Sequence, residues 1–204
     1  MAFASTGDGV RLFYESAGQG RPLVFVHEFG GNYWSWEPQV SYFSGRPQCI
    51  TFAARGYLPS DIPERVEQYP QARAADDIVA VMNAAGIGKA HVVGLSMGAF
   101  ACAHAALRHP DRVLSAVVAG AGYGSEKEHQ EAFRQNSEQV ARGFEERGAE
   151  GFTPFTPRAR RAFSSRTRIH AAGRCLPKGS RNTPPAGPPT LCGASKCAAL
   201  RSTM

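Results

Sequence analysis

The stretch HVVGLSMG at residues 91–98 decides the fold. An apolar, β-branched run ends at Leu95 and passes through Ser96 into residues 97–108, a segment of small residues that Pro110 terminates. Such a run is typical of a strand buried on both faces, and the segment after it is typical of a helix. The glycines at 94 and 98 permit a tight turn between the two, because a larger side chain would collide there.

Similar elements extend on both sides of this stretch. We expect strands over residues 10–15, 23–26, 49–53 and 114–119, where apolar residues run together or alternate. Helical spacing marks residues 32–43, with Asn32 as the N-cap and Trp34, Trp36, Val40 and Phe43 as apolar positions, and residues 72–85, which Gly86 and Gly88 close. The alternation of strands and helices predicts the α/β class, with a mostly parallel sheet and helices on both faces.

The charge distribution divides the chain. All 17 acidic residues lie in residues 1–150, with 13 of the 23 lysines and arginines, whereas residues 151–204 hold the other 10 basic residues and 7 of the 14 prolines. A change of this kind indicates that two different types of sequence have been joined. We therefore divide the chain into a core over residues 1–124, the start of a charged, amphipathic helical cap over 125–150, and a basic, low-order tail over 151–204.

Cysteine usage and the N-terminus suggest a compartment. The five cysteines are odd in number and form no CxxC pair, which favours reduced thiols and a cytoplasmic location. The first residues do not combine a basic start with an apolar stretch, and no run of about 18 apolar residues follows. We therefore expect no membrane partner.

The sequence GLSMG at residues 94–98 has the pattern G-x-S-x-G. A serine hydroxyl is a poor nucleophile unless the backbone exposes it next to groups that stabilise negative charge. The helix that begins at Met97 directs its dipole and its free N–H groups toward the preceding residue. The strand–turn–helix context therefore indicates a nucleophile elbow rather than a chance match.

Residues 20–123 resemble the α/β-hydrolase superfamily, specifically its small-ester and lactone hydrolases and their cofactor-free perhydrolase relatives. Three motifs carry the resemblance in the expected order, VFVHEFGG at residues 24–31, ARGYLPSD at 54–61 and HVVGLSMG at 91–98, and HPDRV at 109–113 is also similar to the family. The resemblance implies the α/β-hydrolase fold and a serine mechanism. It also implies a small-molecule, ester-like substrate.

The resemblance assigns roles to individual residues. Ser96 is expected to be the nucleophile, and the backbone amides of Phe29 and Met97 are expected to form the oxyanion hole. His27 begins the oxyanion loop, where we favour a structural role. The loop at residues 55–57 is expected to shape the edge of the site, with direct catalysis by Arg55 as the less favoured alternative. For Trp34 and Trp36 we favour packing over substrate contact.

Position 96 also separates this chain from neighbours within the superfamily. Epoxide hydrolases and haloalkane dehalogenases resemble the same pattern but have an aspartate at the elbow, so a serine favours acyl transfer. Glu28 departs from the family, which commonly has glycine there, and a carboxylate near the oxyanion would oppose its charge. We expect the side chain of Glu28 to point outward, so that only its backbone matters.

The acid and the histidine of the triad are not identified. In this family they follow the serine on loops after later strands. The histidines after Ser96 lack that setting, and no acidic residue follows Glu150; these histidines are His104, His109, His129 and His170. The acid-free tail has the composition of a GC-rich coding region translated in the wrong frame. We hypothesise a frameshift near residues 150–160, and we expect the chain to be poorly stable and nearly inactive.

Two other functional classes remain open. The chain could be a non-catalytic α/β-hydrolase module that binds a ligand in its pocket. The basic tail could instead bind a polyanion, but its arginines form no amphipathic face and alternate with no aromatic residues, so we expect no nucleic-acid partner. The sequence shows no set of metal ligands and no phosphate-binding loop, and we expect no metal and no cofactor. The oligomeric state and the substrate are not predicted.

Overall fold

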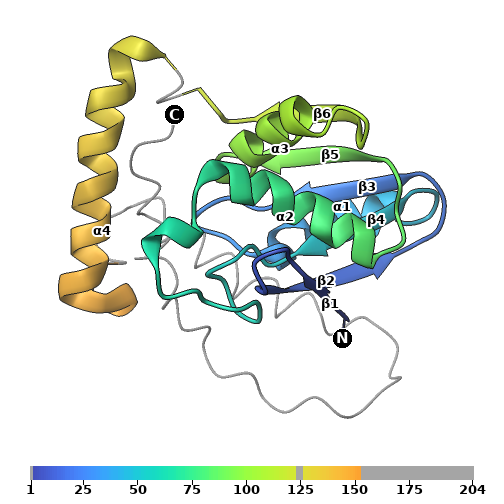
Figure 1. Ribbon diagram of the computed structural model, residues 1–204, viewed down its shortest axis with the longest axis horizontal. Coiled ribbons are helices and arrows are strands. Elements are labelled where there is room, and N and C mark those ends of the chain that lie inside the picture. Colours follow the sequence, from blue (N-terminus) through green and yellow to red (C-terminus); the bar gives the residue numbers. More distant parts are fainter. Residues whose placement is uncertain (1, 123–125, 153–204) are drawn as a thin grey trace.

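A computed structural model describes residues 2–122 and 126–152 (Figure 1). The expected basic tail, including His170, lies outside the described residues. The secondary structure elements follow in chain order: β1 (Ala2–Ser5), β2 (Arg11–Ala17), β3 (Pro22–Val26), η1 (Tyr33–Trp36), α1 (Glu37–Phe43), β4 (Gln48–Phe52), η2 (Val66–Gln68), α2 (Gln71–Ala84), β5 (Ala90–Leu95), α3 (Met97–Arg108), β6 (Val113–Ala119), η3 (Lys127–His129) and α4 (Gln130–Phe152).

The six strands form one sheet in the order β1-β2-β4-β3-β5-β6. The pairs β3–β4, β3–β5 and β5–β6 are parallel, whereas β1 and β2 add an antiparallel edge. This arrangement confirms the predicted α/β class with a mostly parallel sheet. Because parallel strands end at the same edge of a sheet, the loops after β3 and β5 lie close together there.

Helices cover both faces of the sheet, as expected (Figure 1). The larger core lies between the sheet and the helices α2 and α3, and it includes Val24, Val26, Ile78 and Cys102. On the opposite face Phe25 packs with Trp36, so successive residues of β3 enter different cores. This burial of both faces explains why β3 reads as a continuous apolar run.

The helical segment after β3 differs from expectation in its first turn. Asn32 accepts a hydrogen bond from the amide of Trp34 at 2.9 Å, which confirms its capping role. The first turn is a 3₁₀ helix, and the α-helix begins only at Glu37, with Pro38 in its first turn. Proline lacks a backbone N–H and is tolerated at such a start, where that group has no helical acceptor.

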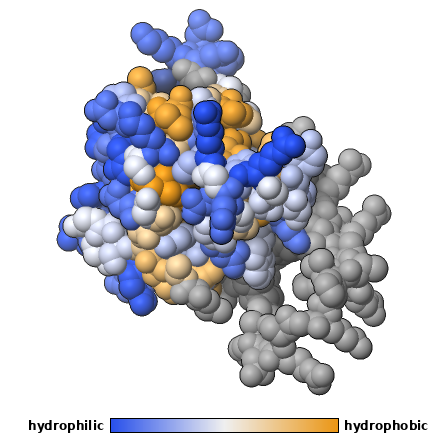
Figure 2. All heavy atoms as spheres, turned by 90° about the vertical axis from the view of Figure 1, so that its right-hand side faces the viewer, coloured by the Kyte–Doolittle hydropathy of each residue, from blue (hydrophilic) through white to orange (hydrophobic). Residues whose placement is uncertain are grey.

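Strand β6 is the outer strand of the sheet among the described residues, and its second edge is unpaired there. Leu114, Val117 and Val118 are each about half exposed, at 49%, 51% and 46%. Figure 2 shows hydrophobic side chains on the upper part of the molecule, where β6 lies in Figure 1. An uncharged, apolar edge of this kind favours aggregation.

The helix expected within residues 126–150 is present as η3 and α4. Its contact with the rest of the chain includes the ring of Phe144, whose centroid lies 6.2 Å from that of Phe29 in an edge-on arrangement. In Figure 1, α4 stands at the edge of the sheet where β3 and β5 end. No helix among the described residues combines the length and the apolar character that a membrane span requires.

Candidate active site

Ser96 occupies the turn between β5 and α3. Its φ of 52° and ψ of −113° place it in a backbone conformation that side chains disfavour, and it is the one non-glycine residue with positive φ among residues 2–122 and 126–152. A conformation of this kind costs about 1–3 kcal/mol and persists where the surrounding structure enforces it. The residue is exposed, so the turn presents its hydroxyl to solvent.

Two glycines allow this turn because backbone atoms pass directly over their α-carbons. A Cβ at position 94 would overlap the carbonyl of Gly98, the second residue of α3. A Cβ at position 98 would overlap the carbonyl oxygens of Val26 and His27 in the neighbouring strand and loop. Both positions therefore require glycine for close packing, as the motif predicted.

Backbone hydrogen bonds hold Ser96 from both sides. Its amide donates to the carbonyl of Ala119 at the end of β6, at 2.8 Å. Its carbonyl accepts from the amides of Ala99 and Phe100 in the first turn of α3. In the part of the chain that the structure describes, the hydroxyl itself makes no hydrogen bond.

The two expected oxyanion donors flank this turn. Met97 is the first residue of α3, so its N–H has no acceptor within the helix. Phe29 lies in the loop after β3, and its amide donates to no acceptor within residues 2–122 and 126–152. A phenol links the two residues, because the hydroxyl of Tyr57 donates to the carbonyl of Phe29 at 2.9 Å and lies 3.8 Å from the sulfur of Met97.

His27 is fully buried, and the backbone engages both of its ring nitrogens. The amide of Ala54 donates to Nε2 at 3.1 Å, so the proton resides on Nδ1, which donates to the carbonyl of Glu28 at 2.8 Å. Burial lowers the pKa of His27 below its usual value, which keeps the ring neutral. A ring held in this way cannot accept a proton from Ser96, so its role is structural.

Tyr57 contacts both expected oxyanion residues, a role that the sequence did not predict. The sequence placed it only in a loop at the edge of the site. Its side chain is buried, and its ring packs edge-on against that of His27, with 4.7 Å between the centroids. Its partners Phe29 and Met97 are 28 and 40 residues away in the chain. Contacts between residues so far apart in the chain cannot be predicted from their spacing in the sequence.

The side chain of Glu28 does not point outward, contrary to expectation. It folds back over Gly31, where a Cβ would overlap its carboxylate, and Oε1 accepts a hydrogen bond from the hydroxyl of Ser35 at 3.2 Å. Its other oxygen is buried and has no hydrogen-bond partner in the described structure. The absence of a side chain at Gly31 makes room for this conformation.

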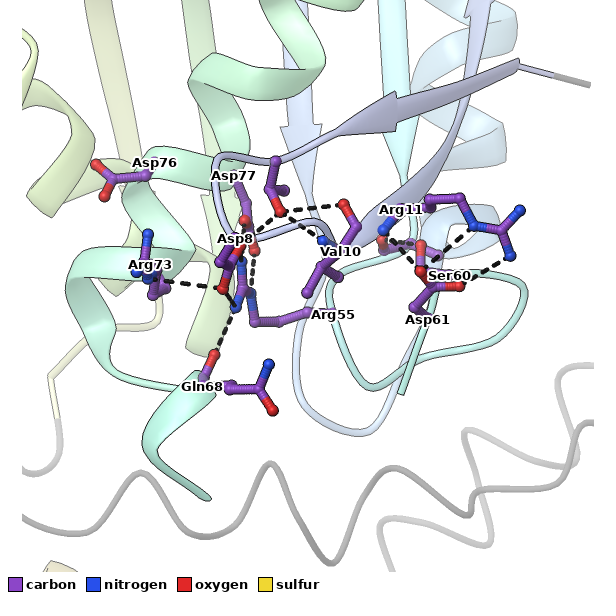
Figure 3. A network of polar contacts seen from close by, with 12 residues as sticks. Asp8, Val10, Arg11, Arg55, Ser60, Asp61, Gln68, Arg73, Asp76 and Asp77 are labelled. Carbon is purple, nitrogen blue, oxygen red and sulfur yellow. Dashed lines mark hydrogen bonds and ion pairs between the residues drawn. The ribbon is translucent and has the colours of Figure 1, made fainter. Parts of the chain in front are cut away.

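Arg55 takes part in a buried ion-pair network rather than in the site (Figure 3). Its Nε and Nη2 atoms each lie 2.6 Å from an oxygen of Asp77, and Nη1 lies 3.0 Å from Asp8. Although burial alone would lower the pKa of Arg55, hydrogen bonds with Asp77 and Asp8 raise it above its usual value. The network joins the β1–β2 turn, the loop after β4, and α2.

The two tryptophans of η1 differ in environment. Trp36 is 9% exposed, and its ring centroid lies 5.0 Å from that of Phe25, which agrees with the favoured packing role. Trp34 is 58% exposed and contacts the ring of Tyr33. The expectation of a packing role for both residues is therefore too broad, because Trp34 projects into solvent.

The described histidines other than His27 either bond to residues outside the turn at Ser96 or lie within a helix. His109 bonds to Asp76 at 2.7 Å, His129 pairs with Glu126, and His91 bonds to Ser115. His104 lies within α3. Among residues 2–122 and 126–152, no three histidine, cysteine, aspartate or glutamate side chains gather as metal ligands would.

The sequence is similar to those of known hydrolases. The chain is 40% identical over 117 residues to the "Putative carbamate hydrolase RutD" of Caulobacter vibrioides, covering 55% of this chain and 42% of that protein. It is 35% identical over 113 residues to "Epoxide hydrolase 3" of Mus musculus, covering 54% of this chain and 31% of that protein. The chain thus spans less than half the length of these relatives.

The fold is also that of solved hydrolase structures. An esterase from Exiguobacterium antarcticum superimposes with a TM-score of 0.72 at 19% identity, covering 98% of this chain and 73% of that chain, which shows likeness of fold. The family model described as alpha/beta hydrolase fold matches residues 21–168, well over half of the sequence. This chain is therefore a member of the alpha/beta hydrolase fold family.

Proposed function

We propose that this chain carries the nucleophilic half of a serine hydrolase that acts on a carboxylic ester or lactone. The strained, exposed backbone of Ser96 supports this proposal most strongly. A fold does not retain a conformation that costs about 1–3 kcal/mol without a reason, and such strain clusters at active sites. Here it places a hydroxyl at the start of a helix, where an amide can stabilise negative charge.

The proposed reaction is acyl transfer to water. The Oγ atom of Ser96 attacks the substrate carbonyl, and the oxygen that becomes negative is held between the amides of Phe29 and Met97. Loss of one such donor lowers turnover by roughly 10²–10³-fold in serine proteases. The bond between the carbonyl carbon and Oγ forms, and the bond to the alcohol oxygen breaks. The alcohol oxygen takes up the proton that Oγ loses, and in a lactone it stays attached to the acyl chain. Water then attacks the acyl-enzyme ester, releases the acid and returns a proton to Oγ.

Ser96 favours this chemistry over that of some relatives. Epoxide hydrolases are among the similar proteins, and the first half of the fold does not separate them from esterases. A serine alkoxide that attacks a carbonyl forms an acyl ester, which water can hydrolyse at the acyl carbon. A serine that opened an epoxide would form a stable ether, so this side chain is unsuited to epoxide hydrolysis.

We expect this chain to be nearly inactive. No described side chain is placed to take the proton of Ser96, since both nitrogens of His27 are already bonded to the backbone. In a serine protease, removal of the base alone lowers turnover by about a millionfold. This observation also supports the alternative that the chain is a non-catalytic module that binds a ligand.

Two assays on the full chain separate these functions. A fluorophosphonate probe should label the protein slowly and only at Ser96, so that the variant Ser96→Ala is unlabelled, while hydrolysis of p-nitrophenyl acetate stays near the background rate. Rapid hydrolysis that Ser96→Ala abolishes would contradict the expected inactivity. Absence of any labelling of correctly folded protein would favour the binding module instead.

We also propose that the chain divides into a core over residues 1–124, a cap over 125–150 and a tail over 151–204, and that the tail arises from a change of reading frame near residues 150–160. The tail's lack of acidic residues supports the proposal. The nucleotide sequence of the locus provides the test. An intact second half of a hydrolase in another frame is the expected result, and the absence of such a pattern from both alternative frames would refute it.

A further inference from the structure

The peptide groups on either side of Phe29 are held by side chains from both flanks. We propose that His27 and Tyr57 are positioning residues, which together direct the amide of Phe29 toward the carbonyl oxygen that Ser96 would attack. The inference rests on the proposed function, since it assigns a role to the oxyanion amide. It goes beyond that function by naming His27 and Tyr57 as the residues that align the amide of Phe29.

His27 orients the peptide that precedes Phe29. The carbonyl of Glu28 accepts from Nδ1 of His27 at 2.8 Å and from the amide of Gly31 at 3.1 Å. In a planar trans peptide, the N–H of Phe29 points in the direction opposite to that carbonyl. Two donors that fix the carbonyl therefore fix the N–H as well.

Tyr57 orients the peptide that follows Phe29. Its hydroxyl donates to the carbonyl of Phe29 at 2.9 Å, and the phenol ring is held against His27. With one peptide plane held on each side, both backbone torsions of Phe29 are restricted. Rotation of either peptide plane would break at least one of these hydrogen bonds.

Both positioning groups depend on the loop after β4. The amide of Ala54 holds the acceptor nitrogen of His27, and the amide of Tyr57 donates to the carbonyl of Ala54 at 3.0 Å. Between these two residues, the side chain of Arg55 is fixed in the buried ion pair with Asp77. Alignment of the amide in the β3 loop is thus set by a second loop, about 25 residues further along the chain.

The variant Tyr57→Phe tests this role, because it removes only the hydroxyl and keeps the ring. Tyr69→Phe is the matched control: Tyr69 is equally buried, belongs to the same aromatic cluster, and donates its hydroxyl to the carbonyl of Pro63 at 2.8 Å. We expect Tyr57→Phe to slow the labelling of Ser96 by an alkyl fluorophosphonate about 10- to 100-fold, because a misplaced donor loses most of its effect. Tyr69→Phe should label at the wild-type rate.

A second readout is independent of the reactivity of Ser96. In ¹⁵N-phenylalanine-labelled protein, the amide resonance of Phe29 should shift and exchange faster with solvent in Tyr57→Phe, and stay unchanged in Tyr69→Phe. If wild-type protein labels and Tyr57→Phe labels equally fast, the inference is wrong while the proposed function stands. If wild-type protein does not label, the proposed function fails, and the Phe29 resonance alone decides the positioning role: no change in Tyr57→Phe would overturn it.

Discussion

Replacing Asp77 with asparagine would leave the guanidinium of Arg55 buried without its bidentate partner. Both side chains are almost inaccessible to solvent, at 5% exposure for Arg55 and 3% for Asp77. Removal of one partner of a buried pair costs about 3–5 kcal/mol, because the other charge stays desolvated. Since Arg55 would keep Asp8 and the carbonyl of Gln68 as acceptors, we expect the lower value, about 3 kcal/mol.

Urea denaturation followed by circular dichroism measures this loss as a lower midpoint at an unchanged slope. The matched control is Glu67→Gln, which removes the acidic partner of Arg65 from a pair that is more than 70% exposed on both sides. Exposed pairs contribute well under about 1 kcal/mol, so the control should unfold close to wild type.

A double variant tests the cause of the loss. If the destabilisation arises from an uncompensated charge, Arg55→Met combined with Asp77→Leu should recover part of the stability that Asp77→Asn loses, because an apolar pair of similar volume needs no desolvation. The recovery is partial because Asp8 and the carbonyl of Gln68 lose Arg55 as their donor. A loss below about 1 kcal/mol in Asp77→Asn, or a double variant less stable than the single one, would refute this account of the network.

Three further predictions concern the elbow and its supports. Gly98→Ala should lower the free energy of unfolding by at least about 2 kcal/mol in urea denaturation, because the new methyl overlaps backbone carbonyls, whereas Gly88→Ala, with open space around it, should be neutral. Burial lowers the pKa of His27, so below pH about 6.5 His27 binds a proton in the unfolded chain and stays neutral in the folded chain. The free energy of unfolding should therefore fall with decreasing pH by up to about 1.4 kcal/mol per pH unit. Thermal unfolding at several pH values measures this slope, which should be smaller in His27→Gln. The hydrogen bond from Arg55 lowers the pKa of Asp8 from 3.8 to about 2, so Asp8→Asn should cost about 2 kcal/mol at pH 7, and its deficit against wild type in urea denaturation should disappear as the pH falls from 4 to 2.

The parts of the fold that could be predicted from the sequence are those with local physical signals. Strands β3 and β5 are apolar because both of their faces are buried, and the elbow needs glycine at two fixed positions because backbones meet there. Strand β1 was missed. It has only four residues, and its large apolar residue, Phe3, is exposed while the small Ala4 is buried, so its apolar pattern does not mark the buried face; pairing with β2 stabilises it.

The candidate site was predicted only as far as its backbone motifs. The strand–turn–helix context indicated Ser96 and its neighbouring amides, because a tight turn requires particular residue types at fixed positions. The conformation of Glu28 could not be predicted, since it depends on free space above Gly31 in the folded loop. The contacts of Arg55 with Asp8 and Asp77 join residues 47 and 22 positions apart, and no local pattern encodes such pairs.

The elbow and the oxyanion loop are stabilised within the first half of the fold. The strained turn at Ser96 is held by Gly94, Gly98 and the bond to Ala119, and the loop after β3 is held by the loop after β4. None of these contacts involves a proton acceptor for the serine. Under the proposed function, placement of the nucleophile is therefore separable from transfer of its proton. A fluorophosphonate expels a good leaving group, so it should label a well-placed hydroxyl slowly even without a base, while an ester that needs a base at each step should be hydrolysed near the background rate.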